Sequence, residues 1–427
     1  MAENESFLWG LIRNIQERRN KKRMLRNISI QNENNKHITR YRPSQIEAFF
    51  SPTDPLGNVL VSGDNNVLRN RAIIGALDSV VNKGTSVVVL HAGNQMLENM
   101  LLQHYQNIFV FNRSNALYEP FIGLSNSEIC RMIQSSATKL CEIHSGGQYY
   151  LEGMSDFIRS KNIPPYCEMY MTCPHLELFD KVDDAEAKGY ISSSLAQRIK
   201  AMLVQGQAQR SDVENYFNLL RHQAQGLLVT KSNLNKATSL RSIVNHNGFA
   251  VLDIGANTND LLINLVLCDL TSALNSGRKV VLVVDGLSVS ASEQLERIVK
   301  NSGVAVYLLI SSDDVYASLN ADENLFASII GKSIKSVILH HASGLSCTKW
   351  AEVIGYYEKQ EVTNTYTSGR NYQSMFSIIP GQTNTDSINV NLKREYIVRP
   401  EEISHMTKDE VYIIDTVNNE LAHTQII

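Results

Sequence analysis

The sequence has few prolines and few cysteines for its length. Nine prolines and six cysteines occur among 427 residues, and 43% of the residues are apolar. This balance excludes a fibrous or largely disordered chain and is typical of a globular protein. The thinly spread cysteines exclude the disulfide framework of a small secreted domain, so we expect reduced thiols and a cytoplasmic protein. Cys167, Cys173 and His175 lack a second pair of ligands at zinc-site spacing, and we expect no metal centre.

Long apolar runs and a strong net charge are also missing. No window approaches the roughly 18 consecutive apolar residues of a membrane-spanning helix. The apolar segment 7–12 precedes its basic cluster, which is the reverse of the order in a signal peptide. The net charge of −3 excludes a global attraction to DNA or to an anionic membrane. Any such contact must be local, and we expect membrane contact to be peripheral, at the inner membrane face.

One local segment has the composition for such a contact. It begins with Phe7, Leu8 and Trp9 and continues into a basic cluster opposed only by Glu17. The pattern predicts a basic amphipathic helix that contacts a membrane surface, DNA or a partner protein. A solvated N-terminal extension is the alternative. The residues predicted to make the contact are Phe7, Leu8, Trp9, Arg18, Arg19, Lys22 and Arg23.

Strand and helix patterns alternate through most of the remaining chain. Continuous β-branched runs such as 86–90 predict strands that are buried on both faces, as in a parallel sheet. Between about 124 and 245 the strand signal disappears and capping-box spacings indicate helices. The sequence therefore predicts an α/β fold with a mostly parallel sheet and an inserted all-helical domain. Strands are expected at 58–62, 86–90, 107–111, 249–254, 279–285, 304–310, 336–340, 396–398 and 411–414, and helices at 68–81 and 260–276. The expected domains are 1–45, a basic segment; 46–123 with 246–427, the α/β domain; and 124–245, the helical insertion.

The first strand is followed by a turn in the position of a phosphate-binding loop. A working loop, G-x-x-x-x-G-K-[ST], cradles phosphates with backbone N–H groups, and its lysine and hydroxyl meet phosphate and Mg²⁺. Only Gly63 is retained here, because Leu68 replaces the second glycine, Arg69 the lysine and Asn70 the hydroxyl residue. The Leu68 side chain hinders close approach of phosphate to the backbone. Weak binding of ATP and Mg²⁺ through Asn70 stays open, hydrolysis is not expected, and an ordinary strand-to-helix turn is the alternative.

Two later strand ends lack further catalytic groups. The apolar strand before Asp285 resembles a Walker B strand, whose aspartate holds Mg²⁺. Gly286 follows it in place of the water-activating glutamate, and a turn or capping role for Asp285 is the alternative. After the next strand, where related motors carry a γ-phosphate-sensing glutamine, the chain has Ser311, Ser312, Asp313 and Asp314. Loss of three separate parts is better explained by abandoned catalysis than by one unusual variant.

The order of these segments resembles the type IV secretion and conjugation coupling proteins, the TraG/TraD-like relatives of the FtsK and HerA motors. The resemblance extends from Gly57 to about Asp415 and includes the basic strand and proline at 393–403. It implies a RecA/FtsK-type P-loop NTPase-like fold, hexameric motor assembly and recruitment of substrates through the all-helical domain. The chain departs from the family in lacking predicted membrane helices and the catalytic residues.

The resemblance and these departures together predict a catalytically degenerate pseudo-ATPase. It would have no catalytic residue and no firmly bound cofactor, and would act as a scaffold or docking protein. Its partners would be protein components of a secretion or conjugation machine, including an active ATPase paralogue. One alternative is an active NTPase that moves DNA or protein, with Arg69 on phosphate and Asp285 on Mg²⁺. Another is an S-adenosylmethionine-dependent methyltransferase, because 251–259 resembles its first motif, although Asn257 and Asn259 replace glycines.

Overall fold

The structure, a computed structural model, describes residues 2–255, 260–274, 277–371 and 381–427. Within these residues ten strands form one sheet in the order β1-β12-β11-β8-β2-β7-β6-β3-β5-β4. The pairs from β8 to β4 are all parallel, while β11 is antiparallel to both β8 and β12. The strands are β1 Ile38–Arg40, β2 Asn58–Ser62, β3 Ser86–His91, β4 Ile108–Phe111, β5 Phe249–Asp253, β6 Val280–Asp285, β7 Val306–Ser312, β8 Ser333–Ile338, β11 Glu410–Asp415 and β12 Glu420–Gln425.

Side chains of successive residues in the central strands pack into two hydrophobic cores, one on each face of the sheet. Val59, Val87 and Val283 join the core that contains α2 and α3, whereas Leu60, Val88 and Leu282 join the core on the opposite face. Continuous β-branched runs suit these strands because both of their faces are covered. The helices of the α/β part are α2 Asn66–Asp78, α3 Gln95–His104, α10 Leu240–Asn245, α11 Asp260–Leu274, α12 Glu293–Lys300, α13 Val315–Ser318, α14 Glu323–Ile330, α15 Gly344–Ile354 and α16 Pro400–Ser404.

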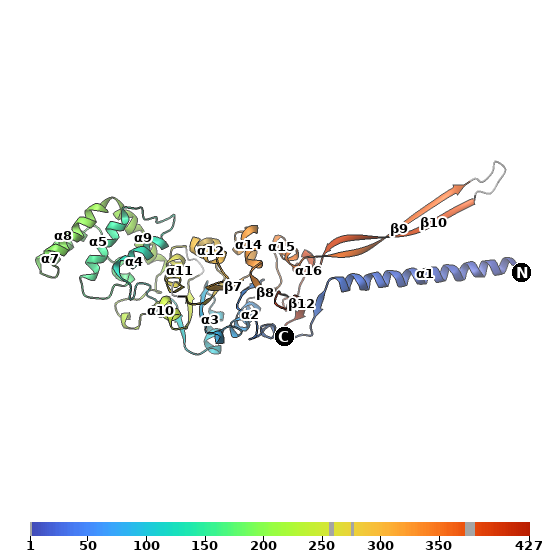
Figure 1. The fold of residues 1–427 in the computed structure, drawn as a ribbon, viewed down its shortest axis with the longest axis horizontal. Helices are drawn as coiled ribbons and strands as arrows, with labels where there is room; N and C mark the ends of the chain where they lie inside the picture. Colours follow the sequence, from blue (N-terminus) through green and yellow to red (C-terminus); the bar gives the residue numbers. More distant parts are fainter. Residues whose placement is uncertain (1, 256–259, 275–276, 372–380) are drawn as a thin grey trace.

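The segment between β4 and α10 is helical and lies at one end of the molecule (Figure 1). Ser125 caps its first helix in a complete capping box with Glu128, as the sequence spacing predicts. Its apolar side chains belong to the same core as those of α11, so the division at 124 and 245 stays a prediction. Its helices are α4 Asn126–Ser136, α5 Gly147–Arg159, α6 Cys167–Met171, α7 Leu178–Ala187, α8 Ser193–Gln205 and α9 Arg210–Gln223.

Two long elements extend from the other end of the molecule (Figure 1). The helix α1, Ala2–Asn35, contains the basic segment, and the strands β9, Tyr356–Asn371, and β10, Gly381–Tyr396, form an antiparallel two-stranded ribbon. Asn32 ties the helix to the ribbon, because its side chain both donates to the Gln360 carbonyl at 3.0 Å and accepts from the Gln360 N–H at 2.8 Å. None of the described helices combines the length and apolarity needed to cross a bilayer.

The strands expected in the parallel part are all present, with ends shifted by a few residues. The strand expected at 396–398 is wrong, because Tyr396 ends β10 and pairs only with β9 outside the main sheet. The ribbon itself was not expected, because most of its sequence is rich in Thr, Ser and Asn and apolar residues alternate with polar ones only over 388–392. The helix expected at 260–276 is described to Leu274, and Ser276 lies outside the described residues.

Candidate functional site

The loop between β2 and α2 uses its backbone N–H groups within the protein. Gly63 donates to the carbonyl of Ser312 and Asp64 to that of His340, each at 3.1 Å. Asn65 caps α2 by accepting the Leu68 N–H at 3.2 Å. An anion at a helix N-terminus is normally held by such free N–H groups. Three donors near this helix start are therefore already paired.

Gly63 has a geometric reason to be glycine. Its φ is +140°, a backbone conformation that glycine adopts readily and that residues with a Cβ rarely adopt. A Cβ at this position would overlap the Leu339 side chain and lie 2.9 Å from the His340 carbonyl oxygen. The glycine thus allows the loop to pack tightly against the end of β8.

The Arg69 side chain turns back onto the loop. Its Nη1 donates to the Gly63 carbonyl at 2.6 Å, and its Nη2 donates to the Asn66 side chain at 3.3 Å. Two of its five donors are therefore committed to neighbouring protein oxygens. Arginine also lacks the compact ammonium that reaches between phosphates in a working loop.

Asp285 and Asn70 are joined by the side chain of Asn94. The Asn94 amide nitrogen donates to Asp285 Oδ2 at 2.7 Å and to Asn70 Oδ1 at 2.9 Å. Its amide oxygen caps α3 by accepting the Leu97 N–H at 3.1 Å, which fixes the orientation of the amide. Asp285 and Asn70 are both buried, and Asp285 Oδ1 has no hydrogen-bond partner among the described residues.

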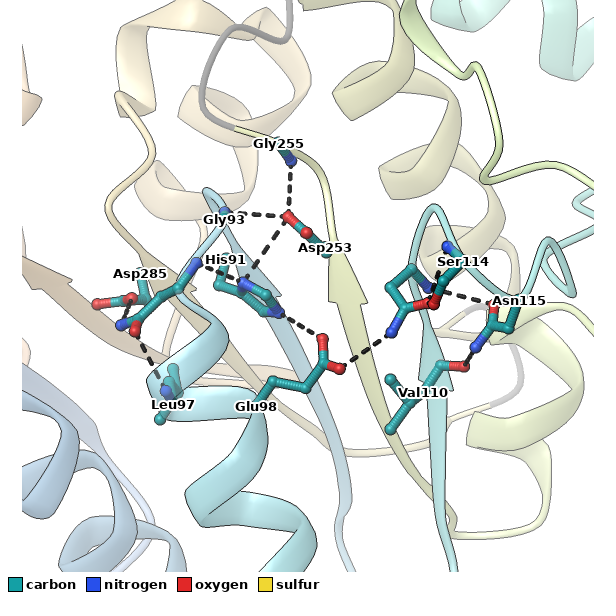
Figure 2. Close-up of polar contacts among 12 residues, drawn as sticks. His91, Gly93, Leu97, Glu98, Val110, Ser114, Asn115, Asp253, Gly255 and Asp285 are labelled. Atoms are coloured by element: carbon teal, nitrogen blue, oxygen red, sulfur yellow. Dashed lines mark hydrogen bonds and ion pairs between the residues drawn. The ribbon is translucent and has the colours of Figure 1, made fainter.

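A second group of titratable side chains lies beside this one, at the carboxyl ends of β3 and β5 (Figure 2). His91 Nδ1 accepts the backbone N–H of Asn94 at 3.0 Å, and its Nε2 lies 3.6 Å from a Glu98 carboxylate oxygen. Asp253 accepts N–H groups from Gly93 and Gly255 at 3.0 and 2.9 Å. Burial lowers the pKa of His91 although Asp253, Glu98 and Asp285 oppose this, so the ring is neutral near pH 7.

Asn94 and Asp285 border a polar cavity of about 470 Å³, which is also lined by Asn66, Arg69, Ala92, Gly93, Gln95, Met96 and Gly286. The cavity lies between the end of β6 and the start of α2. In the sheet, β7 separates β6 from β2, the strand that α2 follows. Three backbone N–H groups of the loop and two Arg69 donors are paired within the protein, whereas Arg69 Nε has no partner among the described residues. Asp285 Oδ1 is the one feature that suits a cation. No cluster of three or more metal-ligating side chains occurs in the described part of the chain.

The structure thus brings together all four residues predicted for the degenerate nucleotide site, Gly63, Arg69, Asn70 and Asp285. Sequence reasoning missed Asn94, His91 and Glu98. The available signal was a polar residue at the end of the β3 run, followed by a Gly-Asn turn.

The residues predicted for membrane or partner contact lie apart from this site, on α1. Arg18, Arg19, Lys22 and Arg23 are exposed. Phe7, Leu8 and Trp9 lie in the distal part of the helix backbone. The N-terminal end of α1 points away from the sheet (Figure 1).

Neither the protein families nor the curated proteins compared with this sequence give a match. Solved structures do. The bacterial conjugative coupling protein TrwB in complex with the non-hydrolysable GTP analogue GDPNP is similar with a TM-score of 0.55 and 14% identity, covering 91% of each chain. Its unbound monoclinic form is similar with a TM-score of 0.50 and 12% identity, covering 90% of each chain. The chain therefore has the P-loop NTPase-like α/β fold of these structures, which confirms at the level of fold the resemblance seen in the sequence.

Proposed function

We propose that this chain is a coupling-protein-like component of a conjugation or type IV secretion system that acts as a scaffold and does not hydrolyse ATP. The observation that carries the proposal is the Asn94 amide, which occupies the space between Asn70 and Asp285. In a working P-loop enzyme the residues at these two positions hold Mg²⁺. The paired N–H groups of the loop support the same conclusion.

The assignment to a transfer system rests on the fold shared with TrwB over nine-tenths of both chains. Fold alone does not fix function. The retained architecture with an internally paired phosphate loop favours a role in assembly over a role as a motor. Its partners in this role are protein components of the machine and an active ATPase paralogue.

Two surfaces are proposed for docking. The first is the helical insertion, 124–245, which corresponds in position to the all-helical domain through which the type IV coupling proteins recruit substrates. The basic face of α1 carries four exposed cations, Arg18, Arg19, Lys22 and Arg23, and is proposed to contact an anionic membrane surface. This contact would place the protein peripherally at the inner membrane face.

An active NTPase remains the second candidate because one observation favours it. Asp285 Oδ1 is buried without a hydrogen-bond partner and borders the polar cavity near Arg69. A cation bound there would satisfy this oxygen. The methyltransferase alternative has no comparable support, and Asn257 and Asn259, on which it depends, lie outside the described residues.

Calorimetric titration with Mg-ATP and a phosphate-release assay on the same purified protein separate the two candidates. The scaffold proposal predicts no binding heat and no phosphate. Binding with turnover that Asp285→Ala abolishes would establish an active NTPase instead. Thermal melting with S-adenosylmethionine checks the methyltransferase alternative, because a ligand that prefers the native state raises the melting temperature.

The role in transfer needs a separate cellular test. In its native host, we expect loss of the protein to lower transfer of DNA or protein, and both the wild-type chain and Asp285→Ala to restore it equally. Rescue by the wild type alone would indicate that the Asp285 carboxylate has a chemical role. No effect of the loss on transfer would remove the assignment to a transfer system.

A further inference from the structure

Two adjoining cavities form a groove along α11, outside the site already described. The first, about 470 Å³, lies between α4, α10, α11 and α12. The second, about 390 Å³, continues along α11 and α12 to the start of β7. They share Thr271, Gln294 and Arg297, so their linings are continuous. We call them together the arginine groove.

Three arginines line the first cavity, each from a different helix. Arg131 comes from α4, Arg241 from α10 and Arg297 from α12. Arg131 and Arg297 are exposed and make no ion pair with any described residue. Arg241 is held in place, because its Nη1 donates to the buried Asp269 at 3.1 Å and its Nη2 to the Ile122 carbonyl at 2.6 Å. Three of its five N–H donors stay outside these two bonds.

Nearby carboxylates balance this cluster only in part, because Asp269 pairs with Arg241 alone. Glu128, which also lines the cavity, is used by the α4 capping box, where it accepts from the Ser125 hydroxyl at 2.6 Å. On α12, Glu293 pairs with Lys139 at 3.8 Å and Glu296 with Lys300 at 2.5 Å. The pKa of Glu128 is held low, first by its hydrogen bonds with Ser125 and further by the charges of Arg241 and Arg131. Of the three arginines, Arg241 is paired with Asp269, whereas Arg131 and Arg297 have no ion-pair partner among the described residues.

The second cavity is largely apolar. Leu274, Ile298, Ala305 and Val306 line it, and Val304 at its end is 77% exposed. Burying the exposed Val304 side chain against an apolar ligand is favourable, because it removes apolar surface from water. A ligand that fills the whole groove must therefore be anionic at one end and apolar at the other.

We propose that the arginine groove binds a short acidic peptide segment of a partner protein, with its carboxylates at Arg131, Arg241 and Arg297 and an apolar side chain beside Val304. Arginine forks match carboxylates with two parallel hydrogen bonds, and they come from helices that hold them in fixed relative positions. The complementary charge of the groove identifies the class of partner. This inference is independent of the nucleotide site, because no residue of the groove borders the cavity at Asp285.

Nucleic acid is a poorer fit for the same arginines. Single-stranded nucleic acids bind through aromatic side chains on which bases stack. The described lining of the groove contains no aromatic residue. The apolar half would also face a charged backbone without any compensating contact.

A random peptide library displayed on phage, selected on the full-length protein and counter-selected on the double variant Arg131→Glu/Arg297→Glu, tests the proposal. Enriched peptides should combine aspartate or glutamate with a neighbouring apolar residue. The most enriched peptide, labelled with fluorescein, should bind the wild type in an anisotropy titration. Its affinity should fall at least tenfold in the double variant and weaken with salt.

The matched control is Lys181→Glu/Lys188→Glu, which makes the same charge change on exposed lysines of the helical insertion. It should bind the peptide like the wild type, and all three proteins should melt at similar temperatures because the changed residues are exposed. Enriched peptides without acidic residues, or equal loss in the control, would overturn the proposal. The proposal would also be overturned if a twenty-nucleotide thymidine oligonucleotide bound more tightly than the peptide and lost this binding in the double variant Arg131→Glu/Arg297→Glu.

Discussion

The side-chain amide of Asn94 lies 2.7 Å from the Asp285 carboxylate and 2.9 Å from the side-chain oxygen of Asn70. One neutral donor thus links the two positions at which a P-loop ATPase would hold its metal ion. The amide oxygen caps α3 at the same time, so Asn94 connects the end of β6 to the helix that follows β3. It gives one oxygen of the buried Asp285 a hydrogen-bond donor from within the protein.

Asn94→Asp should destabilise the protein in a pH-dependent way. It places a second carboxylate against the buried Asp285 and removes the donor between them, so the pKa of the pair rises. A folded-state pKa above the unfolded value destabilises the protein as pH rises. We therefore expect the loss of unfolding free energy relative to the wild type to be larger at pH 7.5 than at pH 4.5, as measured by urea denaturation.

Asn94→Ala is the control for this prediction. It removes the hydrogen bonds without adding a charge, so its stability loss of about 1–3 kcal/mol should vary much less with pH. Parallel pH profiles for the two variants would mean that Asp285 does not sense the new carboxylate, and would contradict the burial and contact described for it.

Gly63→Ala should destabilise the protein strongly, while Gly84→Ala should have a mild effect. Both glycines have positive φ, +140° and +68° respectively, so both variants carry backbone strain of about 1–3 kcal/mol. At Gly63 the added Cβ also meets Leu339 and the His340 carbonyl, whereas nothing lies within 4 Å of a Cβ at Gly84. Chemical denaturation of both variants measures the difference. Equal losses would show that the loop end of β2 is not packed tightly against β8.

A carboxyl group in the core should contribute stability that falls as pH rises from about 4.5 to 7, against an opposite contribution from buried histidines such as His341, whose pKa burial lowers to about 4. Burial raises the pKa of Glu119 to about 7, although the N–H groups of Phe121 and Cys167 that it accepts oppose the rise. Between the unfolded and the folded pKa, the folded state keeps the Glu119 proton at pH values at which the unfolded chain has lost it. The stabilisation is complete below the unfolded pKa and is lost by the folded pKa, on the order of 3 kcal/mol in total.

Glu119→Gln should remove the contribution of this carboxyl to the pH dependence of the unfolding free energy, as measured by urea denaturation between pH 4.5 and 7.5. Part of the slope should remain, because burial also raises the pKa of Asp269 to about 7. Glu128→Gln is the matched control, since Glu128 is exposed at the start of α4 and its pKa is lowered by Ser125. A profile for Glu119→Gln as steep as the wild type would show that the carboxyl is ionised in the fold.

The sequence was sufficient for the parallel part of the sheet but not for the contacts at its edge. Runs such as Val87 to Leu90 are apolar and mostly β-branched, as suits a strand with both faces buried, so they are visible without a structure. Asn94 acts on Asp285 only because the sheet order makes β3 and β6 neighbours, and that order is not written in local spacing. His91 and Glu98 meet more locally, across the turn that joins β3 to α3.

The ribbon formed by β9 and β10 shows a different limit. A strand that packs one face on a core alternates apolar and polar residues, and this periodicity is the usual signal. Exposed residues such as Val390 and Leu392 alternate in β10 among polar neighbours without a core beneath them. The pairing is instead specified by backbone hydrogen bonds between two distant segments, which a polar sequence does not reveal.

The helix α1 presents two different faces. Ile28 is buried and Asn32 bonds to the ribbon, whereas Arg19, Arg23 and Arg26 lie on the opposite side at about 100° per residue and are exposed. Residues 1–35 contain seven basic and four acidic side chains, so the rest of the chain is net −6 against an overall −3. The positive charge is therefore concentrated on the element that extends from the body.

Replacing Arg18, Arg19, Lys22 and Arg23 with alanine should abolish binding to vesicles that contain 30% phosphatidylglycerol, because each cation near an anionic surface contributes about 1 kcal/mol. Co-sedimentation measures the effect, and the melting temperature should stay unchanged because these side chains are exposed. Removing Lys161, Lys181, Lys188 and Lys139 instead takes away equal charge elsewhere and should leave binding intact. If the wild type does not bind anionic vesicles but binds duplex DNA through the same four residues, the partner of α1 is nucleic acid and not the membrane.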